Sequence, residues 1–293
     1  MTDALARLDP ALLAGGAALL GLVVGSFLNV VILRLPVMLE RRWRADCRQL
    51  LAGEGAPAAP AEETDFNLLR PGSTCPHCGH AIRPWENIPV LSWLLLRGRC
   101  SACRGAISAR YPLVELATAL LSAVVAWRLG AQWPTLAALG LTWTLIALTV
   151  IDFDHQLLPD ALTLPLLWAG LLVNLDGALV PYRDALLGAV AGYGVLWGVF
   201  HVFRLLTGKE GMGYGDFKLL AALGAWLGWQ ALPLIVILAS TLGALTGGLL
   251  ILLRRHRQGV PIPFGPFLAA AGWIALMWGA DLTRAYLRYA GLG

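Results

Sequence analysis

The feature that most constrains the fold is a series of long apolar runs that follow one another along most of the chain. Most are long enough for a helix to cross the hydrocarbon core of a bilayer, and the short, Gly-rich sixth run is the weakest. With 58% hydrophobic and only 14% charged residues, the chain is too apolar for a soluble enzyme. The sequence therefore predicts an all-α polytopic membrane protein with about eight transmembrane helices. The runs cover residues 11–33, 112–129, 134–151, 157–175, 184–206, 216–231, 232–253 and 264–282.

Arginine residues indicate how these helices are oriented. The polar segment 36–110 holds ten arginines, and further basic clusters follow the fifth and the seventh apolar runs. Alternating spans that start outside place all three clusters on the cytoplasmic side, as the positive-inside rule requires. We therefore expect a multi-pass protein of the cytoplasmic membrane. The arginines fit topology and lipid contact better than nucleic-acid binding, so we expect lipid and no nucleic acid among the partners.

The polar segment after the first run divides the chain into three predicted domains. Residues 1–35 form the first transmembrane helix, 36–110 a small cytoplasmic domain inserted after it, and 111–293 a helical membrane domain. Within the second, the Ala-, Pro-, Gly- and Glu-rich stretch at 52–63 has no core-forming pattern and is predicted to be a flexible insert. The rest of that domain is too short to bury a large core and needs a staple.

Two Cys-x2-Cys pairs supply such a staple. They are separated by 21 residues, a spacing close to that of zinc ribbons, and consist of Cys75, Cys78, Cys100 and Cys103. Four thiolates complete a tetrahedral site, so the predicted zinc ion is structural and leaves no position for water. A disulfide or thiol-redox centre is the alternative, but stable disulfides are rare on the cytoplasmic side. Cys47 has no partner in this pattern and is interpreted as a plain free thiol.

Two aspartates stand at the edges of apolar runs, where an ionisable group is costly and marks a functional site by default. Asp152 directly follows the third run, and Asp216 begins the sixth; the predicted topology puts both on the cytoplasmic side. Two carboxylates brought together share a proton and activate water, as aspartic proteases do. Asp154 and Asp160 lie near Asp152, but a solvated loop accounts for the first and helix N-capping for the second.

The residues around Asp216 are unusual for their glycines. Gly213, Tyr214 and Gly215 precede it, and Lys218 follows it. Because glycine permits positive φ and a close approach of an extended substrate, we assign these four residues to an active-site loop. An ordinary flexible loop between helices is the alternative. Lys218 is interpreted as an interfacial residue or as a local charge partner.

Polar residues inside the apolar runs are few. Ser26 and Asn29 are three apart in the first run and share a helix face. Hydrogen bonding between helices accounts for them without catalysis, and we favour that interpretation.

Several segments carry a family resemblance that covers nearly the whole chain apart from about residues 37–65. They are Gly25–Pro36, the two cysteine pairs, Asn87–Trp93, Arg97–Cys103, Ile107–Glu115, Asp152–Asp160, Gly208–Lys218 and Pro261–Pro266. In these motifs the sequence resembles the bacterial prepilin peptidases, also called type IV prepilin leader peptidases.

The resemblance implies a bifunctional enzyme of the bacterial inner membrane. Its membrane aspartic endopeptidase, of the Gly-x-Gly-Asp type, has catalytic aspartates that correspond to Asp152 and Asp216. It removes the leader of type IV prepilins or type II secretion pseudopilins after glycine, on the cytoplasmic face. The new N-terminal residue is then methylated with S-adenosylmethionine, and the intact cysteine domain leads us to expect that this activity is retained. No fingerprint for this methyl donor is recognisable; candidates lie near Arg97–Arg99 and Glu115, and the cofactor-binding residues stay unassigned.

Two other classes of function fit less well. A proton-coupled membrane transporter predicts acidic groups deep within the spans, and the apolar runs hold almost none. A membrane thiol oxidoreductase predicts reactive cysteines on the oxidising side, opposite to the charge bias. A structural scaffold for pilus assembly is a further possibility, which proteolysis assays on single aspartate variants separate from the enzyme.

Overall fold

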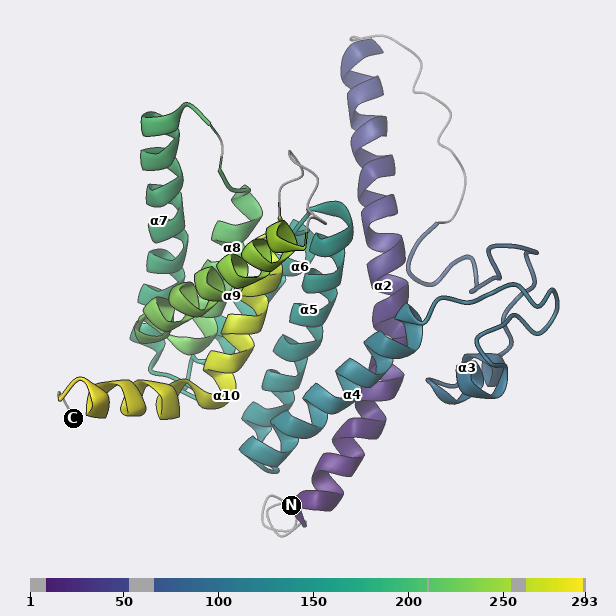
Figure 1. Cartoon of the computed structure of the whole chain (residues 1–293), viewed down its shortest axis with the longest axis horizontal. Helices are drawn as coiled ribbons and strands as arrows, with labels where there is room; N and C mark the ends of the chain where they lie inside the picture. The colour runs from purple at the N-terminus through teal and green to yellow at the C-terminus, as the bar shows by residue number, and fades with distance from the viewer. Residues whose placement is uncertain (1–8, 53–65, 210, 254–261, 292–293) are drawn as a thin grey trace. The chain divides into compact units, whose positions relative to one another are not determined.

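The structure is a computed structural model that describes residues 9–52, 66–209, 211–253 and 262–291 (Figure 1). Every regular element in these ranges is a helix, and strand-like pairing is limited to two isolated bridges. The predicted all-α class is therefore confirmed. The predicted flexible insert lies, apart from residue 52, outside the described residues, and so does the basic cluster that follows the seventh apolar run. The described chain forms two compact units that divide at residues 124 and 125.

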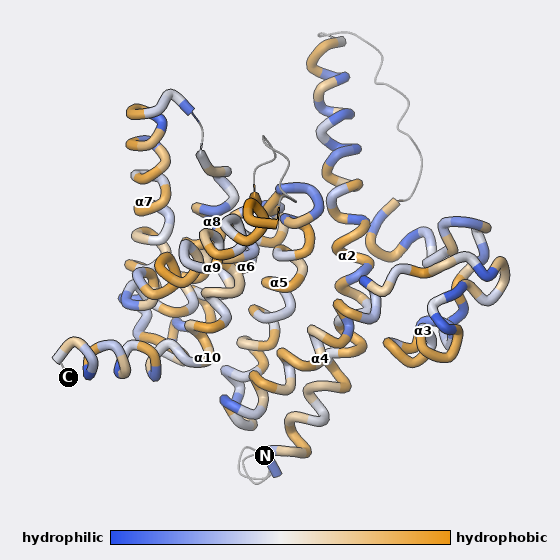
Figure 2. The backbone as a smooth tube through the Cα atoms, viewed as in Figure 1, coloured by the Kyte–Doolittle hydropathy of each residue, from blue (hydrophilic) through white to orange (hydrophobic). Residues whose placement is uncertain are grey.

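The first unit begins with α2 (Pro10–Ala52), a continuous helix of 43 residues. Its N-terminal part is mostly apolar, whereas its C-terminal part contains hydrophilic turns before an apolar end (Figure 2). It continues past residue 35, where the sequence analysis ended the first helix. The extension is favoured by an i,i+4 ion pair between Glu40 and Arg44, whose side chains lie 2.6 Å apart.

The helix α4 (Arg110–Leu129) packs against α2 through two glycines. A Cβ atom on Gly21 would lie 2.7 Å from the Cα of Ala119, and one on Gly25 would lie 2.7 Å from the Cα of Glu115. The two backbones are therefore in direct contact, in the small-xxx-small manner of membrane helices. Between them in sequence lies the cysteine segment, which carries only the short helices η1 (Pro84–Asn87) and α3 (Leu91–Leu95).

The second unit is a helical bundle built around α8 (Tyr214–Leu227). Ten of the fourteen residues of α8 are buried. It packs against α6, α7 and α10 (Figure 1). The surrounding elements are α5 (Trp133–His155), α6 (Asp160–Val173), α7 (Tyr182–Thr207), η2 (Trp229–Ala231), α9 (Leu232–Leu252) and α10 (Gly265–Tyr289).

Glycines bring the neighbours of α8 close to it. A Cβ atom on Gly188 of α7 would overlap the carbonyl group of Gly224 in α8, and Gly192, one turn further, is almost as tightly packed. On the α6 side, a Cβ atom on Gly170 would lie 2.5 Å from the indole ring of Trp226. The position of α8 is thus fixed by contacts that leave no room for a larger residue at these glycine positions of α6 and α7.

Five described helices are long and apolar enough to cross a membrane: α2, α4, α5, α7 and the stretch Trp229–Leu252 that contains α9. The chain is therefore a multi-pass membrane protein. The predicted number of eight spans is approximate, because α10 is not among these five and α6 and α8 have only 14 residues each. Both fall short of the roughly 20 residues that cross a bilayer.

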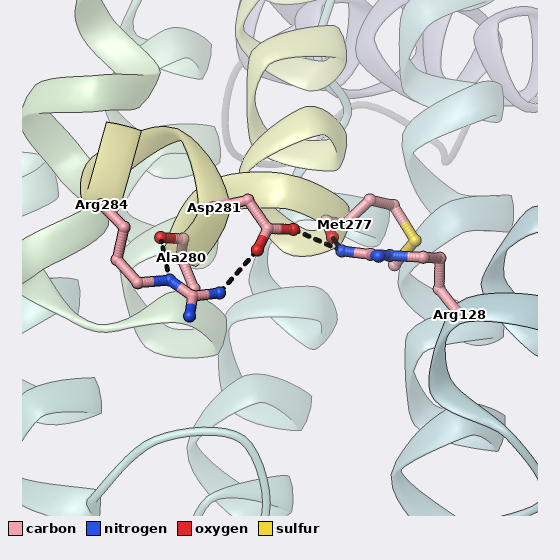
Figure 3. A network of polar contacts seen from close by, with 5 residues as sticks. All are labelled: Arg128, Met277, Ala280, Asp281 and Arg284. Carbon is pink, nitrogen blue, oxygen red and sulfur yellow. Dashed lines mark hydrogen bonds and ion pairs between the residues drawn. The ribbon is translucent and has the colours of Figure 1, made fainter. Parts of the chain in front are cut away.

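A polar network joins the end of α4 to α10 within the second unit (Figure 3). The guanidinium of Arg128 donates to the Asp281 carboxylate at 2.6 Å and to the carbonyl of Met277 at 3.0 Å. Arg284 donates to the same carboxylate at 2.7 Å and to the carbonyl of Ala280 at 3.3 Å. The side chains of the ion pair are about half exposed, so each bond contributes little to stability.

Candidate active site and metal centre

Asp152 lies in the last turn of α5 and is 5% exposed. The helix ends just after it at Gln156, which has a positive φ of 51° and donates its backbone N–H to the Asp152 carbonyl at 2.9 Å. The Asp152 carboxylate interacts with the backbone N–H of Gly265 at the start of α10. A Cβ atom on Gly265 would lie 2.5 Å from the Asp152 Oδ2 atom, so only glycine fits beside this carboxylate.

Asp216 lies in the first turn of α8 and is 7% exposed. Gly213 is the N-cap of this helix and has an extended backbone, with φ −85° and ψ 153°. The N-terminus of a helix carries a partial positive charge that stabilises a carboxylate placed there. Asp216 is therefore held at a buried position by the bundle, with its carboxylate at the positive end of its own helix.

The two aspartates come from distant parts of the sequence and meet at one place. Asp152 and Asp216 are close enough to repel each other electrostatically. Their glycine neighbours pack against the buried side chain of Leu158: a Cβ atom on Gly215, which precedes Asp216, would lie 2.8 Å from it, and one on Gly265, which lies beside Asp152, would lie 3.0 Å from it. The end of α5 and the starts of α8 and α10 therefore converge around one leucine.

The basic residue that follows Asp216 does not pair with it. Lys218 forms an ion pair with Asp160, the first residue of α6, with nitrogen–oxygen distances of 2.6 and 2.8 Å. Among the ion pairs of the described residues, none involves Asp152 or Asp216. Two buried carboxylates without a cationic partner are stabilised when they share a proton, which is the protonation that acid–base catalysis by a carboxylate pair requires.

The predicted loop around Asp216 is wrong in its secondary structure. Only Gly213 precedes the helix, whereas Tyr214, Gly215 and Lys218 lie in the first turns of α8. Neither glycine has the positive φ that the sequence suggested. The physical reason for Gly215 is packing, because a larger residue would collide with Leu158. Burial of α8 thus outweighs the low helix propensity of glycine.

The four predicted metal ligands lie together in the first unit. Their Sγ atoms are all within 4.8 Å of one another. The Sγ–Sγ distance is 3.8 Å between Cys75 and Cys103 and 4.0 Å between Cys78 and Cys100. Four sulfurs at about 2.3 Å from a tetrahedral metal ion lie about 3.8 Å from one another, so the donor set fits such an ion. Cys47 is exposed and lies outside the cluster.

The two cysteine pairs have the same backbone turn. Gly79 donates its N–H to the Cys75 carbonyl at 2.9 Å, and Arg104 donates its N–H to the Cys100 carbonyl at 3.0 Å. Gly79 and Arg104 both have positive φ, at 72° and 59°. Glycine adopts this conformation at no steric cost, whereas an arginine is strained there. The second turn is thus held in a strained conformation by its surroundings.

A cavity of about 550 Å³ lies beside the cysteine cluster, where the cysteine segment faces α2 and α4. Glu115 of α4 is 7% exposed and accepts a hydrogen bond from the backbone N–H of Val90 at 2.7 Å. It also forms a hydrogen bond with the Ser26 hydroxyl of α2. Asn29 donates to the carbonyl of Tyr111 at 3.1 Å. The predicted helix–helix hydrogen bonding of Ser26 and Asn29 is therefore confirmed, and both residues line the cavity.

A second carboxylate in the wall of the cavity, Glu86, is strongly hydrogen-bonded. It accepts the backbone N–H of Arg83 at 2.9 Å and lies 3.2 Å from His80. The backbone bond from Arg83, with further bonds from Ser101 and His80, lowers the pKa of Glu86 to about 2. Glu86 is therefore ionised at neutral pH.

The sequence analysis did not predict this cavity. It pointed to Glu115 and to Arg97–Arg99 without choosing between them. The signal available was the spacing of Gly21 and Gly25, which marks a close helix crossing and places Ser26 beside the partner helix.

The fold and these sites define an all-helical, multi-pass membrane protein with a buried carboxylate pair and a four-cysteine cluster. Residues 19–129 match the bacterial peptidase A24 N-terminal domain, and residues 139–248 match the type IV leader peptidase family. The chain belongs to the type IV leader peptidase family.

Relatives are similar to the chain over almost its whole length. A prepilin leader peptidase/N-methyltransferase of Aeromonas salmonicida is 63% identical over 269 residues, which cover 92% of each chain. Proteins of the same name from Pseudomonas aeruginosa and Neisseria gonorrhoeae are 60% and 51% identical and cover 93% and 92% of each chain. No solved structure matches the chain.

Proposed function

We propose that this protein removes the leader peptide of type IV prepilins and type II secretion pseudopilins and then methylates the new N-terminus. The observation that carries the peptidase half is the meeting of Asp152 and Asp216 as two buried carboxylates without a cationic partner among the described residues. The methyltransferase half rests on the names and the near-complete coverage of the relatives.

In the proposed peptidase reaction the two carboxylates act together on a water molecule. The ionised carboxylate accepts a proton from the water, whose oxygen attacks the carbonyl carbon of the last glycine of the leader. The protonated carboxylate donates its proton to the carbonyl oxygen. The carbon–nitrogen bond then breaks and the leaving amine takes up a proton, so one water molecule is consumed for each bond cut.

We place the protein in the bacterial inner membrane, with both sites facing the cytoplasm. The support is the charge pattern: arginines are concentrated in the segment 36–110, and Arg204 and Lys209 lie at the end of the fifth apolar run. Asp152 and Asp216 lie at the same side under this topology. The basic leader of a prepilin remains on the cytoplasmic face, where the proposed site can reach it.

We propose zinc as the ion of the four-cysteine cluster, because a closed four-thiolate site suits this metal and leaves it no catalytic position. S-adenosylmethionine is the proposed methyl donor; when bound it would supply a methyl group to the neutral N-terminal amine, with S-adenosylhomocysteine and one proton released as the other products. The cysteines hold the segment 66–109 in shape, and the peptide chain supplies the binding surface for the donor.

The test is leader cleavage in membranes that contain wild type, Asp152→Asn or Asp216→Asn at matched expression. Asparagine keeps the shape of aspartate and removes its ionisable group. We expect the cleavage rate of each variant to fall by about a hundredfold or more, because one partner of the acid–base pair is missing. Asp154→Asn is the matched control, since Asp154 is exposed in the same turn of α5.

Normal cleavage by either variant would remove that aspartate from the mechanism. A wild-type protein that accumulates in the membrane and never cleaves a prepilin would refute the peptidase assignment itself. Loss of cleavage in the Asp154→Asn control would show that any change in this turn disturbs the site. The Asp152→Asn result would then carry no weight, and Asp216→Asn alone would test the mechanism.

A further inference from the structure

The cavity in the first unit has the size and composition of a small-molecule site. Its volume of about 550 Å³ lies within the range of about 300 to 1,000 Å³ in which proteins bind such ligands. Most of the surface of its wall is apolar, although polar residues make up nearly half of the lining. No step of the proposed peptidase reaction uses this cavity.

The charged groups of the cavity are two carboxylates and one guanidinium. Glu115 and Glu86 supply the carboxylates, and Arg34 of α2 supplies the guanidinium, held by a bond of 2.9 Å to the carbonyl of Asn67. The complement of this set is a ligand with two cationic groups and one carboxylate. S-adenosylmethionine has this set: a sulfonium, an ammonium and a carboxylate.

Aromatic side chains complete the wall. Trp93 donates its indole N–H to the carbonyl of Ile107 at 3.1 Å, and Gly98 packs against its ring, so the ring is held in one orientation. Tyr111 and Phe66 also line the cavity. Aromatic faces stack with a purine base and attract a cation placed over them. The wall therefore suits both the adenine and the sulfonium of the donor.

We propose that this cavity binds S-adenosylmethionine and that the Glu115 carboxylate faces its sulfonium charge. The proposal rests on the methyltransferase half of the proposed function and names its binding site. Glu115 is the best placed carboxylate because it is almost fully buried, where the attraction between opposite charges is least screened by water. Arg97 and Arg99, the other sequence candidates, are exposed and are not part of the wall.

The decisive measurement compares a charged ligand with an uncharged one. Purified full-length protein in lipid nanodiscs is titrated by calorimetry with S-adenosylmethionine and with S-adenosylhomocysteine, which lacks the methyl group and the sulfonium charge. The proteins are wild type, Glu115→Gln and Glu40→Gln. Glutamine keeps an oxygen that can accept the Val90 N–H, and Glu40 is an exposed glutamate of the same unit, away from the cavity.

We expect Glu115→Gln to weaken binding of S-adenosylmethionine about tenfold or more and binding of S-adenosylhomocysteine by less than about threefold. Glu40→Gln should bind both ligands as wild type does. Leader cleavage and bound zinc serve as checks that the Glu115→Gln protein is folded, because neither the carboxylate pair nor the cysteines are changed.

Unchanged binding of both ligands by Glu115→Gln would overturn the proposal. An equal loss for both ligands would also overturn it, because Glu115 would then only support the Val90 backbone. If wild type methylates prepilin and Glu115→Gln binds the donor normally, the proposed binding site is wrong and the methyltransferase half of the proposed function stands. A wild type that cleaves but neither binds nor uses the donor contradicts the methyltransferase half of the proposed function.

A second measurement does not depend on a variant. Wild-type protein is irradiated with radiolabelled S-adenosylmethionine, and the labelled peptides are identified. Label within residues 85–115, which contain Trp93 and Tyr111, supports the proposal. Label that is confined to the helices of the second unit overturns it. When a prepilin is added to the mixture, label that is found only on the prepilin also overturns it.

Discussion

The carboxylate site and the cysteine segment hold their polar groups in place by different means. In the second unit, α8 carries Asp216, and ten of its fourteen residues are buried against neighbouring helices. In the cysteine segment, the short helices η1 and α3 have no buried residue. Burial of apolar surface and close backbone contact therefore position the carboxylate site, whereas four thiols on two tight turns position the cysteine segment.

This difference determines which changes each region tolerates. A helix packed through glycines is sensitive to the volume of a single side chain, and it needs no ligand to form. A segment with almost no core depends on the metal that we propose for its cysteines, and volume changes at its surface matter little. The following predictions, from the largest effect to the smallest, would break or sharpen this contrast.

The largest effect is expected from removing one thiol. Cys100→Ser should release the bound metal and make the segment 66–109 sensitive to protease, because metal binding supplies on the order of 10 kcal/mol to small four-ligand sites. Methyl transfer should be lost, and leader cleavage should fall far less. Metal content and limited proteolysis are the measurements, with Cys47→Ser as the control. An equal loss of cleavage would mean that the carboxylate site also depends on the metal.

The next effect concerns the contact between α7 and α8. Gly188→Ala places a methyl group against the backbone of Gly224 and should destabilise the bundle by about 1–3 kcal/mol. The thermal unfolding midpoint and the rate of leader cleavage should fall together, because α8 carries Asp216. Gly194→Ala is the matched control: it lies in the same helix with open space around it and should be neutral or slightly stabilising. Equal behaviour of the two variants would disprove close packing as the determinant.

A smaller effect is expected at the ion pair that joins α6 to α8. Lys218→Gln breaks the contact with Asp160, whose side chain is 56% exposed, and should cost less than about 1 kcal/mol. Cleavage should change by less than about fivefold. Asp160→Asn should have the same effect, and the double variant should add nothing further. A loss as large as that of Asp216→Asn would instead place Lys218 in the chemistry.

The smallest effect is expected at the network between α4 and α10. Asp281→Asn removes two exposed ion pairs and should lower stability by a few tenths of a kcal/mol. High salt should abolish the difference from wild type, because exposed charges are screened. Unfolding measured at low and high salt checks this. A difference that persists in high salt would indicate that Asp281 is held by the fold and not by charge alone.

The sequence was sufficient where the signal is local. Apolar run lengths indicated a multi-pass helical protein, and the spacing of the cysteine pairs indicated a cluster that the structure contains. It failed where a contact between distant segments decides the outcome. Gly215 suggested a loop because glycine permits positive φ, yet the burial of α8 makes it helical. The cavity at Glu115 depends on the crossing of α2 and α4, which hydropathy alone does not locate.

The short length of α6 and α8 has a consequence for the surrounding lipid. At about 1.5 Å per residue, a helix of 14 residues extends about 21 Å, which is well below the roughly 30 Å of a hydrocarbon core. Where such a helix faces lipid, its polar ends stay hydrated when the bilayer becomes thinner around it. Bilayer thickness then acts on the reaction as a physical variable. Acyl chains of different length should change the rate of leader cleavage without altering a single residue.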